Sequence, residues 1–274
     1  MKKLFQLEFI KTYNNPAFRA IILLHAILFL IVVIIGSQFE INIQGIQVRK
    51  LFVFPHVWGT FAWIGSWFNL LLGILIAILV GNEHQFKTFR KQVVEGLPRT
   101  DLLNAKLIII GCVALYAFLL IFFSGLVFGL ITTNDPWSSD IFGNIYLVLI
   151  LFIQAFAYMM LGMVFTIALR NNALAIVLFI LFFALIEPIF RAFFPSSIDK
   201  FFPVKIISNL TPVPDFFGIA AGDLIQIKSS SPTDLYSMGI LPEHLELGPS
   251  IIMSIAYIIL FYFICRLLLK RMDL

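Results

Sequence analysis

Long apolar runs alternate with short polar stretches along this chain of 274 residues. A helix rises about 1.5 Å per residue, so about 20 apolar residues are needed to cross the hydrocarbon core of a bilayer. The apolar runs predict six transmembrane helices at 18–37, 57–80, 102–131, 141–169, 173–189 and 250–269. They are continuous rather than alternating, which predicts an all-α membrane protein and not an outer-membrane barrel.

We treat 1–274 as a single transmembrane domain. Besides the six spans it contains the segments 1–15, 191–249 and 81–100. Residues 1–15 mix charged and apolar side chains, which predicts a helix lying at the membrane interface. Residues 191–249 form one long extracytoplasmic segment that is interrupted by prolines and cannot span. We expect helices there that lie on the surface or re-enter the membrane where protein covers their backbone.

The polar, basic segment 81–100 separates the second and third apolar runs. Its apolar residues recur at helical spacing, at Phe86, Phe89, Val93 and Leu97. The spacing predicts a short amphipathic helix, which Gly96 and Pro98 then end. Two interpretations stay open: a basic loop that follows the positive-inside rule, or a lever that docks a soluble partner.

Composition and charge narrow the class of protein. The hydrophobic fraction is 61%, charged residues make up 12%, and the mean hydropathy is +1.00, which a soluble domain of this length could not keep in water. The net charge of +4 comes with no basic patch interleaved with aromatic residues, so nucleic acid is not an expected partner.

The distribution of basic residues predicts the orientation. With the N-terminus inside and six spans, 13 of the 19 Lys and Arg residues fall on the inner side. This places both termini and the segment 81–100 in the cytoplasm.

No motif for catalysis or nucleotide binding is found. Residues 81–88 imitate a phosphate-binding loop, but Phe86 replaces the second glycine and no strand precedes it. The four His residues are scattered, and neither a metal site nor a nucleophile elbow is present. We therefore expect that this chain is not an enzyme and binds no cofactor or metal.

A few polar residues inside the apolar runs are candidates for a translocation pathway. Asn69 and Gln154 lie within the second and fourth runs, although Gln154 could instead make an interhelical hydrogen bond. Glu187 and Pro188 lie near the end of the fifth run, where proline should kink or finish the helix. They form a possible gate.

Two passages carry a resemblance to a known family. The passage Glu95–Lys106 (EGLPRTDLLNAK) and the basic ending Leu269–Leu274 (LKRMDL), together with the six-span layout, resemble the membrane subunit of type 2 ATP-binding-cassette (ABC) exporters. The phrase at 83–86 (EHQF) departs from the family's usual pattern.

The resemblance implies a permease in the bacterial cytoplasmic membrane that pairs with a second copy or a homologue, with spans one, two and five near the contact. Separate ATPase subunits would bind ATP and Mg, and 81–100 would be the coupling helix. The residues expected to couple to the ATPase are Phe86, Lys87, Phe89, Arg90, Val93 and Leu97. The alternative function is a membrane scaffold or anchor of a secretion or motility complex, and an intramembrane enzyme is a more distant third.

Overall fold

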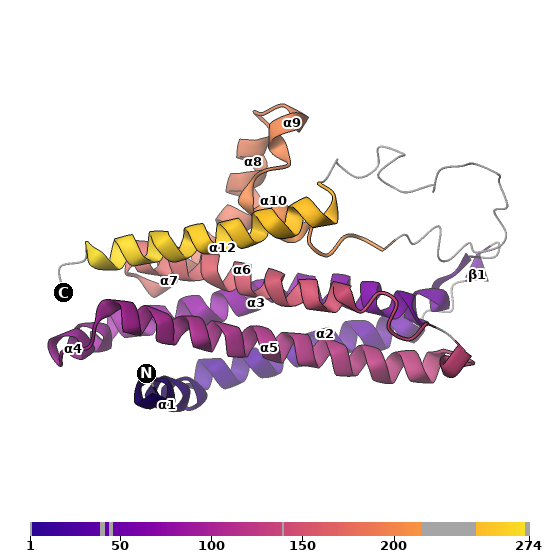
Figure 1. Cartoon of the computed structure of the whole chain (residues 1–274), viewed down its shortest axis with the longest axis horizontal. Helices are drawn as coiled ribbons and strands as arrows, with labels where there is room; N and C mark the ends of the chain where they lie inside the picture. Colours follow the sequence, from indigo (N-terminus) through magenta and orange to yellow (C-terminus); the bar gives the residue numbers. More distant parts are fainter. Residues whose placement is uncertain (1, 39–41, 44–45, 139, 215–244, 272–274) are drawn as a thin grey trace.

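A computed structural model describes residues 2–38, 42–43, 46–138, 140–214 and 245–271, and it shows a bundle of long helices packed side by side (Figure 1). Six helical segments are long and apolar enough to cross a membrane: α2 (Pro16–Gln38), α3 (His56–Gln85), α5 (Arg99–Thr132), α6 (Tyr146–Leu169), the segment Asn172–Arg191, and α12 (Leu247–Lys270). The predicted all-α class and the six spans are confirmed. The fourth helix begins five residues later than predicted, because residues 141–145 form turns.

Short elements connect the long helices. They are α1 (Lys2–Tyr13), β1 (Asn42–Ile43), β2 (Ile46–Gln47), η1 (Val48–Phe52), α4 (Thr88–Val94), η2 (Pro136–Ser138), α9 (Ser196–Asp199) and α10 (Pro203–Ser208). The two strands pair antiparallel through two residues each. Residues 215–244, about half of the predicted extracytoplasmic segment 191–249, lie outside the described residues.

Helices α3 and α6 form the centre of the bundle. In α6, 67% of the most apolar window is buried, against 17% in α2, in Asn172–Arg191 and in α12. The backbones of α3 and α6 approach closely: a Cβ atom on Gly162 would lie 2.6 Å from the carbonyl oxygen of Gly73. Any larger residue at Gly162 would push the two central helices apart.

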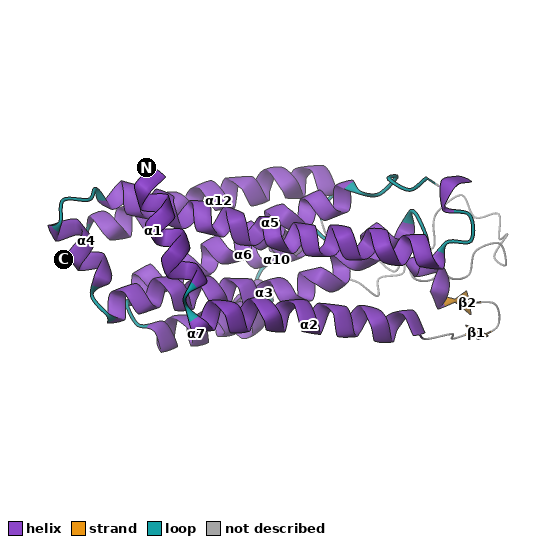
Figure 2. Ribbon diagram, turned by 90° about the horizontal axis from the view of Figure 1, so that it is seen from below, coloured by secondary structure: helices purple, strands orange, loops and turns teal. Residues whose placement is uncertain are grey.

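The two ends of the bundle carry different elements. The N-terminal helix α1, the short helix α4 and the last turn of α12 gather at one end, whereas β1 and β2 lie at the other (Figures 1 and 2). We call the end that carries α4 the α4 end. One hydrophobic cluster packs around α4 and its neighbours, and a second, which contains Phe29, Trp58 and Phe61, packs near η1.

The fifth span is not a regular α-helix. It consists of α7 (Asn172–Leu181), a π-helical stretch (Phe182–Ile186) and α8 (Glu187–Arg191). Because Pro188 has no N–H group, the carbonyl of Ala184, four residues earlier, lacks its usual helical donor. The π stretch lies at this point of the span. Beyond it, α8 and α9 stand out from the bundle, and α10 returns towards α12 (Figure 1).

Candidate functional site

The segment between α3 and α5 contains two left-handed residues that shape it. Lys87 has φ 55° and breaks the helix after Gln85, so that α4 covers only seven residues. Gly96 has φ 94°, which glycine tolerates without strain, and α5 begins just after Pro98. The structure has a short helix within the predicted segment, but α4 ends at Val94, before Gly96 and Pro98, and it is not continuous through Phe86.

This break divides the predicted coupling residues into two sets. Phe89 is only 3% exposed and stacks on His84 with ring centroids 5.5 Å apart, while Val93 and Leu97 pack against the same core cluster. Phe86, in contrast, is 69% exposed.

The two predicted basic residues, Lys87 and Arg90, are exposed together with Phe86, and so is the neighbouring Lys91. Phe89, Val93 and Leu97 therefore anchor α4 to the bundle, and the other three predicted residues, Phe86, Lys87 and Arg90, form its outer surface. Val94, which was not predicted, joins this surface and is 77% exposed.

Below α4 lies a cluster of four charged residues that we call the charge clasp: Glu8 from α1, Lys11 from α1, Glu83 from α3 and Lys106 from α5. Glu8 and Glu83 are 1% and 2% exposed, and Lys106 is 8% exposed. The Lys106 ammonium donates to both carboxylates, and Lys11 pairs with Glu83 and lies 3.5 Å from Glu8. Two carboxylates and two ammonium groups balance, so the clasp joins three helices without a net charge.

The electrostatics of Glu8 follow from this geometry. Burial raises the pKa of the Glu8 carboxyl, and the ammonium groups of Lys106 and Lys11 lower it by more, so that the pKa lies below its ordinary value of 4.5. Gln92 of α4 also faces this carboxylate. The Thr88 hydroxyl further ties α4 to α3, since it donates to the carbonyl of Glu83 over 3.3 Å.

The sequence did not identify the clasp. Glu8 and Lys106 are 98 residues apart, and their contact depends on where α1 folds back. A weak signal was present, since Lys106 interrupts the apolar run of α5 and Glu83 does the same at the end of α3. Charged side chains within such runs usually pair with one another.

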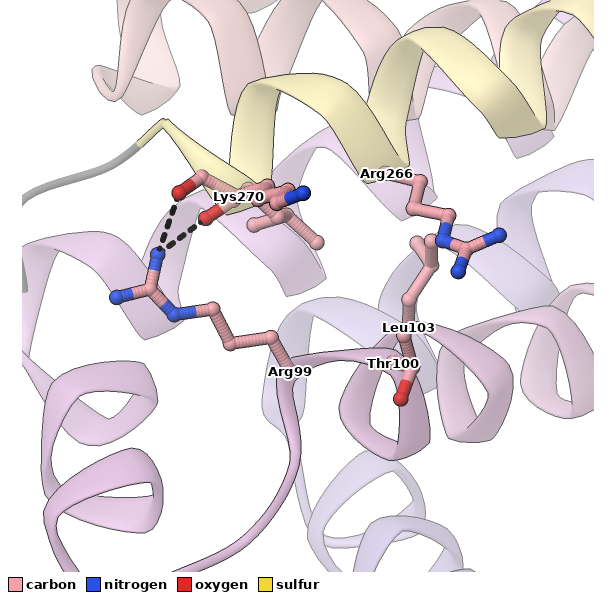
Figure 3. Close-up of a pocket in the computed structure, with 6 residues that line it drawn as sticks. Arg99, Thr100, Leu103, Arg266 and Lys270 are labelled. Atoms are coloured by element: carbon pink, nitrogen blue, oxygen red, sulfur yellow. Dashed lines mark hydrogen bonds between the residues drawn. The ribbon is translucent and has the colours of Figure 1, made fainter.

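A second basic group lies beside the start of α5. The Arg99 guanidinium donates to the carbonyls of Leu269 and Lys270 over 2.6 and 3.2 Å, and so caps the C-terminal end of α12 (Figure 3). Arg266 and Lys270 border the same cavity of about 240 Å³. The base of the α4 segment is thus fixed to α1 by the clasp and to α12 by Arg99.

The two pathway candidates contact each other in the middle of the bundle. The Asn69 amide donates to the Gln154 side-chain oxygen over 3.0 Å, and the Gln154 amide donates to Thr211 and to the carbonyls of Ile207 and Ser208. Both side chains are buried. Gln154 therefore makes the interhelical bond that the sequence left open, and it also holds the loop after α10. A role for either residue in translocation stays a prediction.

Glu187 lies at the joint between the π stretch and the segment that projects from the bundle. It is 2% exposed, and its carboxylate accepts the backbone N–H groups of Val204 and Lys205 over 2.9 and 2.8 Å. These are free donors in the first turn of α10. Glu187 thus holds α10 against the fifth span, and the predicted gate at Glu187 and Pro188 stays a prediction.

Comparison with known proteins identifies the family. The sequence profile of ABC-2 family transporter proteins matches residues 4–186 of this chain. The chain belongs to the ABC-2 transporter family. No curated protein matches it. The match covers α1, the first four spans and the fifth as far as the π stretch, so it includes the whole clasp and the α4 segment.

Membership of the ABC-2 family confirms the resemblance read from the sequence. The chain is a multi-pass membrane protein and a permease component of an ABC transporter. As a transport component it differs from the catalytic subunit, and membership implies association with ABC ATPase subunits.

Proposed function

We propose that this ABC-2 permease is an exporter subunit whose α4 segment receives the force of ATP hydrolysis from a separate ATPase. The observation that carries the proposal is the outer surface of α4, where Phe86 and Val94 are exposed at an end of the bundle held by charged groups. An apolar centre with a charged rim is the usual composition of a protein interface. In the proposed orientation this end and both termini face the cytoplasm of a bacterium.

The charges around these two residues fit the rim of such a contact. Lys87, Arg90 and Lys91 are exposed beside them, and none of the three forms an ion pair with another described residue. Phe86 would enter a pocket of the ATPase, while the basic side chains would lie at its border or at lipid headgroups. ATP and Mg would be held by the ATPase and not by this chain.

A second permease copy or a homologue would complete the transporter. The faces of α2, the fifth span and α12 stay largely uncovered in one copy, since only 17% of each apolar window is buried. Lipid and the partner subunit would share these faces. The pathway would then lie between the two copies, with the central helices α3 and α6 behind it.

Copurification of the ABC ATPase tests the docking surface. Phe86→Ala and Val94→Ala should each weaken recovery of the ATPase, since an aromatic residue at the centre of an interface can contribute about 2 kcal/mol, roughly 30-fold in affinity. Val127→Ala is the matched control, because Val127 is 50% exposed on α5 far from α4. Phe89→Ala should instead lower the stability of the permease, since Phe89 is buried in its own core.

The outcome separates a transporter subunit from a scaffold. Equal recovery of the ATPase with Phe86→Ala, Val94→Ala and Val127→Ala, together with unchanged substrate-stimulated ATP hydrolysis, would exclude the coupling role of α4. The non-transporting anchor would then be the better account of the chain. Matched membrane levels of each variant are needed, so that loss of recovery reports on docking and not on insertion.

A further inference from the structure

A cavity of about 430 Å³ lies between α3, α6, the π stretch and the loop that follows α10. This volume is within the range of ligand pockets and exceeds the roughly 240 Å³ of the cavity beside Arg99. Its α3 wall runs from Trp63 to Leu70, about 10 to 21 Å along the helix from His56 at 1.5 Å per residue. The cavity is therefore at membrane depth, beside the Gln154 amide.

Aromatic rings dominate the lining of this cavity. Trp63 and Trp67 meet edge to face with centroids 4.5 Å apart and an angle of 75°, and Tyr158 and Phe183 do the same at 5.6 Å and 71°. Ring faces carry the negative part of the aromatic quadrupole and attract cations. Two such pairs from different helices give the cavity walls that suit a flat, apolar or cationic group.

Two serine hydroxyls in the lining offer acceptor oxygens to a ligand. The Ser66 hydroxyl donates to the carbonyl of Trp63 over 2.6 Å, and the Ser208 hydroxyl donates to the carbonyl of Lys205 over 2.9 Å. Their hydrogens are thus used, and their oxygens keep free lone pairs. The Gln154 side-chain amide already has hydrogen-bond partners within the protein. Its N–H groups donate to the end of α10 and the loop after it, and its oxygen accepts from Asn69.

Among the described residues that line the cavity, none is charged. The charges nearest in sequence are already paired: Lys205 with Asp199 at 2.5 Å, and Glu187 with the first turn of α10. An anion that entered the cavity would lose its water and find no cation, which is costly. A cation would exchange part of its hydration for ring faces and hydroxyl oxygens.

We propose that this cavity is a binding site for lipophilic organic cations, a substrate class for the exporter function proposed above, on which this inference rests. The cation would lie against the ring faces of Trp63 and Trp67, with its apolar substituents towards Tyr158 and Phe183. The Asn69–Gln154 pair would set the floor of the site and hold the loop after α10 that closes one side.

Two probes of similar shape and opposite charge test the class of ligand. Tetraphenylphosphonium should bind the purified permease saturably, and Trp67→Leu should weaken its binding about tenfold, as the loss of a cation–π contact predicts. Trp67→Phe keeps a ring and should retain most of the affinity. Trp137→Leu is the control, because Trp137 is 88% exposed on η2 and does not line the cavity.

Tetraphenylborate should show no binding that depends on Trp67. The proposal is overturned if the borate binds as tightly as the phosphonium with the same dependence on Trp67, or if Trp67→Leu and Trp137→Leu bind the phosphonium equally. Trp67 is 53% exposed, so its replacement leaves the buried core intact. The assay contains no ATPase, and its result is therefore separate from that of the docking test.

Discussion

Removing the central ammonium of the charge clasp should loosen α1 and destabilise the α4 end of the bundle. Lys106→Met keeps most of the side-chain volume and leaves the carboxylates of Glu8 and Glu83, which are 1% and 2% exposed, with only Lys11 between them. Breaking a buried ion pair on one side costs about 3–5 kcal/mol, because the remaining charge stays buried. Lys11 is still present, so we expect a loss near the lower limit, about 3 kcal/mol.

Denaturant unfolding in detergent measures this loss, and hydrogen exchange shows where it begins. Amides of α1 should lose protection first in Lys106→Met, because α1 contacts the bundle mainly through α5 and α2 and its carboxylate would repel Glu83. Lys87→Met is the matched control, since Lys87 is exposed at the same end and its replacement should change stability by no more than about 0.5 kcal/mol.

A double variant separates charge from packing. In Glu83→Gln/Lys106→Met the remaining Glu8 and Lys11 balance, so the double variant should regain part of the stability that Lys106→Met loses. Two results would refute the reasoning: a loss in Lys106→Met no larger than that in Lys87→Met, or losses that simply add in the double variant. Either would mean that the clasp contributes no coupling between α1, α3 and α5.

Three more outcomes are expected. Because the pKa of Glu8 lies below 4.5 when it is paired, its contribution to stability is complete above pH 4.5 and is lost as the pH falls through the lowered pKa. The protection of α1 in hydrogen exchange should therefore decrease in that acidic range. The decrease should be smaller in Glu8→Gln. Glu187→Ala should leave two buried N–H groups of α10 unpaired and cost about 1–3 kcal/mol in unfolding free energy, whereas Glu187→Gln should cost less. A cysteine at Thr88 in a Cys-free background should react with an impermeant reagent only after the membrane is opened, and labelling in intact cells would reverse the proposed orientation.

The parts of the fold that follow from local sequence were predictable. Each apolar run is long enough to require a membrane, so the number and order of the spans could be read directly. The short helix in 81–100 and its end at Gly96 were also readable, since glycine is the residue that accepts φ 94° at a helix end. The break at Lys87 was not, because nothing in a lysine side chain favours a left-handed conformation.

That single break changed the interpretation of the site. With a continuous helix, Phe86 and Phe89 would lie on one face and enter a partner together. Because the left-handed conformation of Lys87 separates α3 from α4, Phe89 is buried in the core whereas Phe86 is exposed. Burial of this kind depends on packing against α3 and α5, which no pattern of spacing within 81–100 contains.

The clasp and the docking surface together suggest how a load on α4 would spread. Gln92 and Thr88 of α4 face Glu8 and the end of α3, and Arg99 at the start of α5 holds the last turn of α12. A force applied at Phe86 would therefore be transmitted to α1, α3, α5 and α12 through these ion pairs and hydrogen bonds. The aromatic cavity lies farther along α3, between that helix and α6. Helix α3 contributes Glu83 to the clasp and Trp63 and Trp67 to the cavity, so a shift of α3 along or about its axis would link docking at α4 to the size of the cavity.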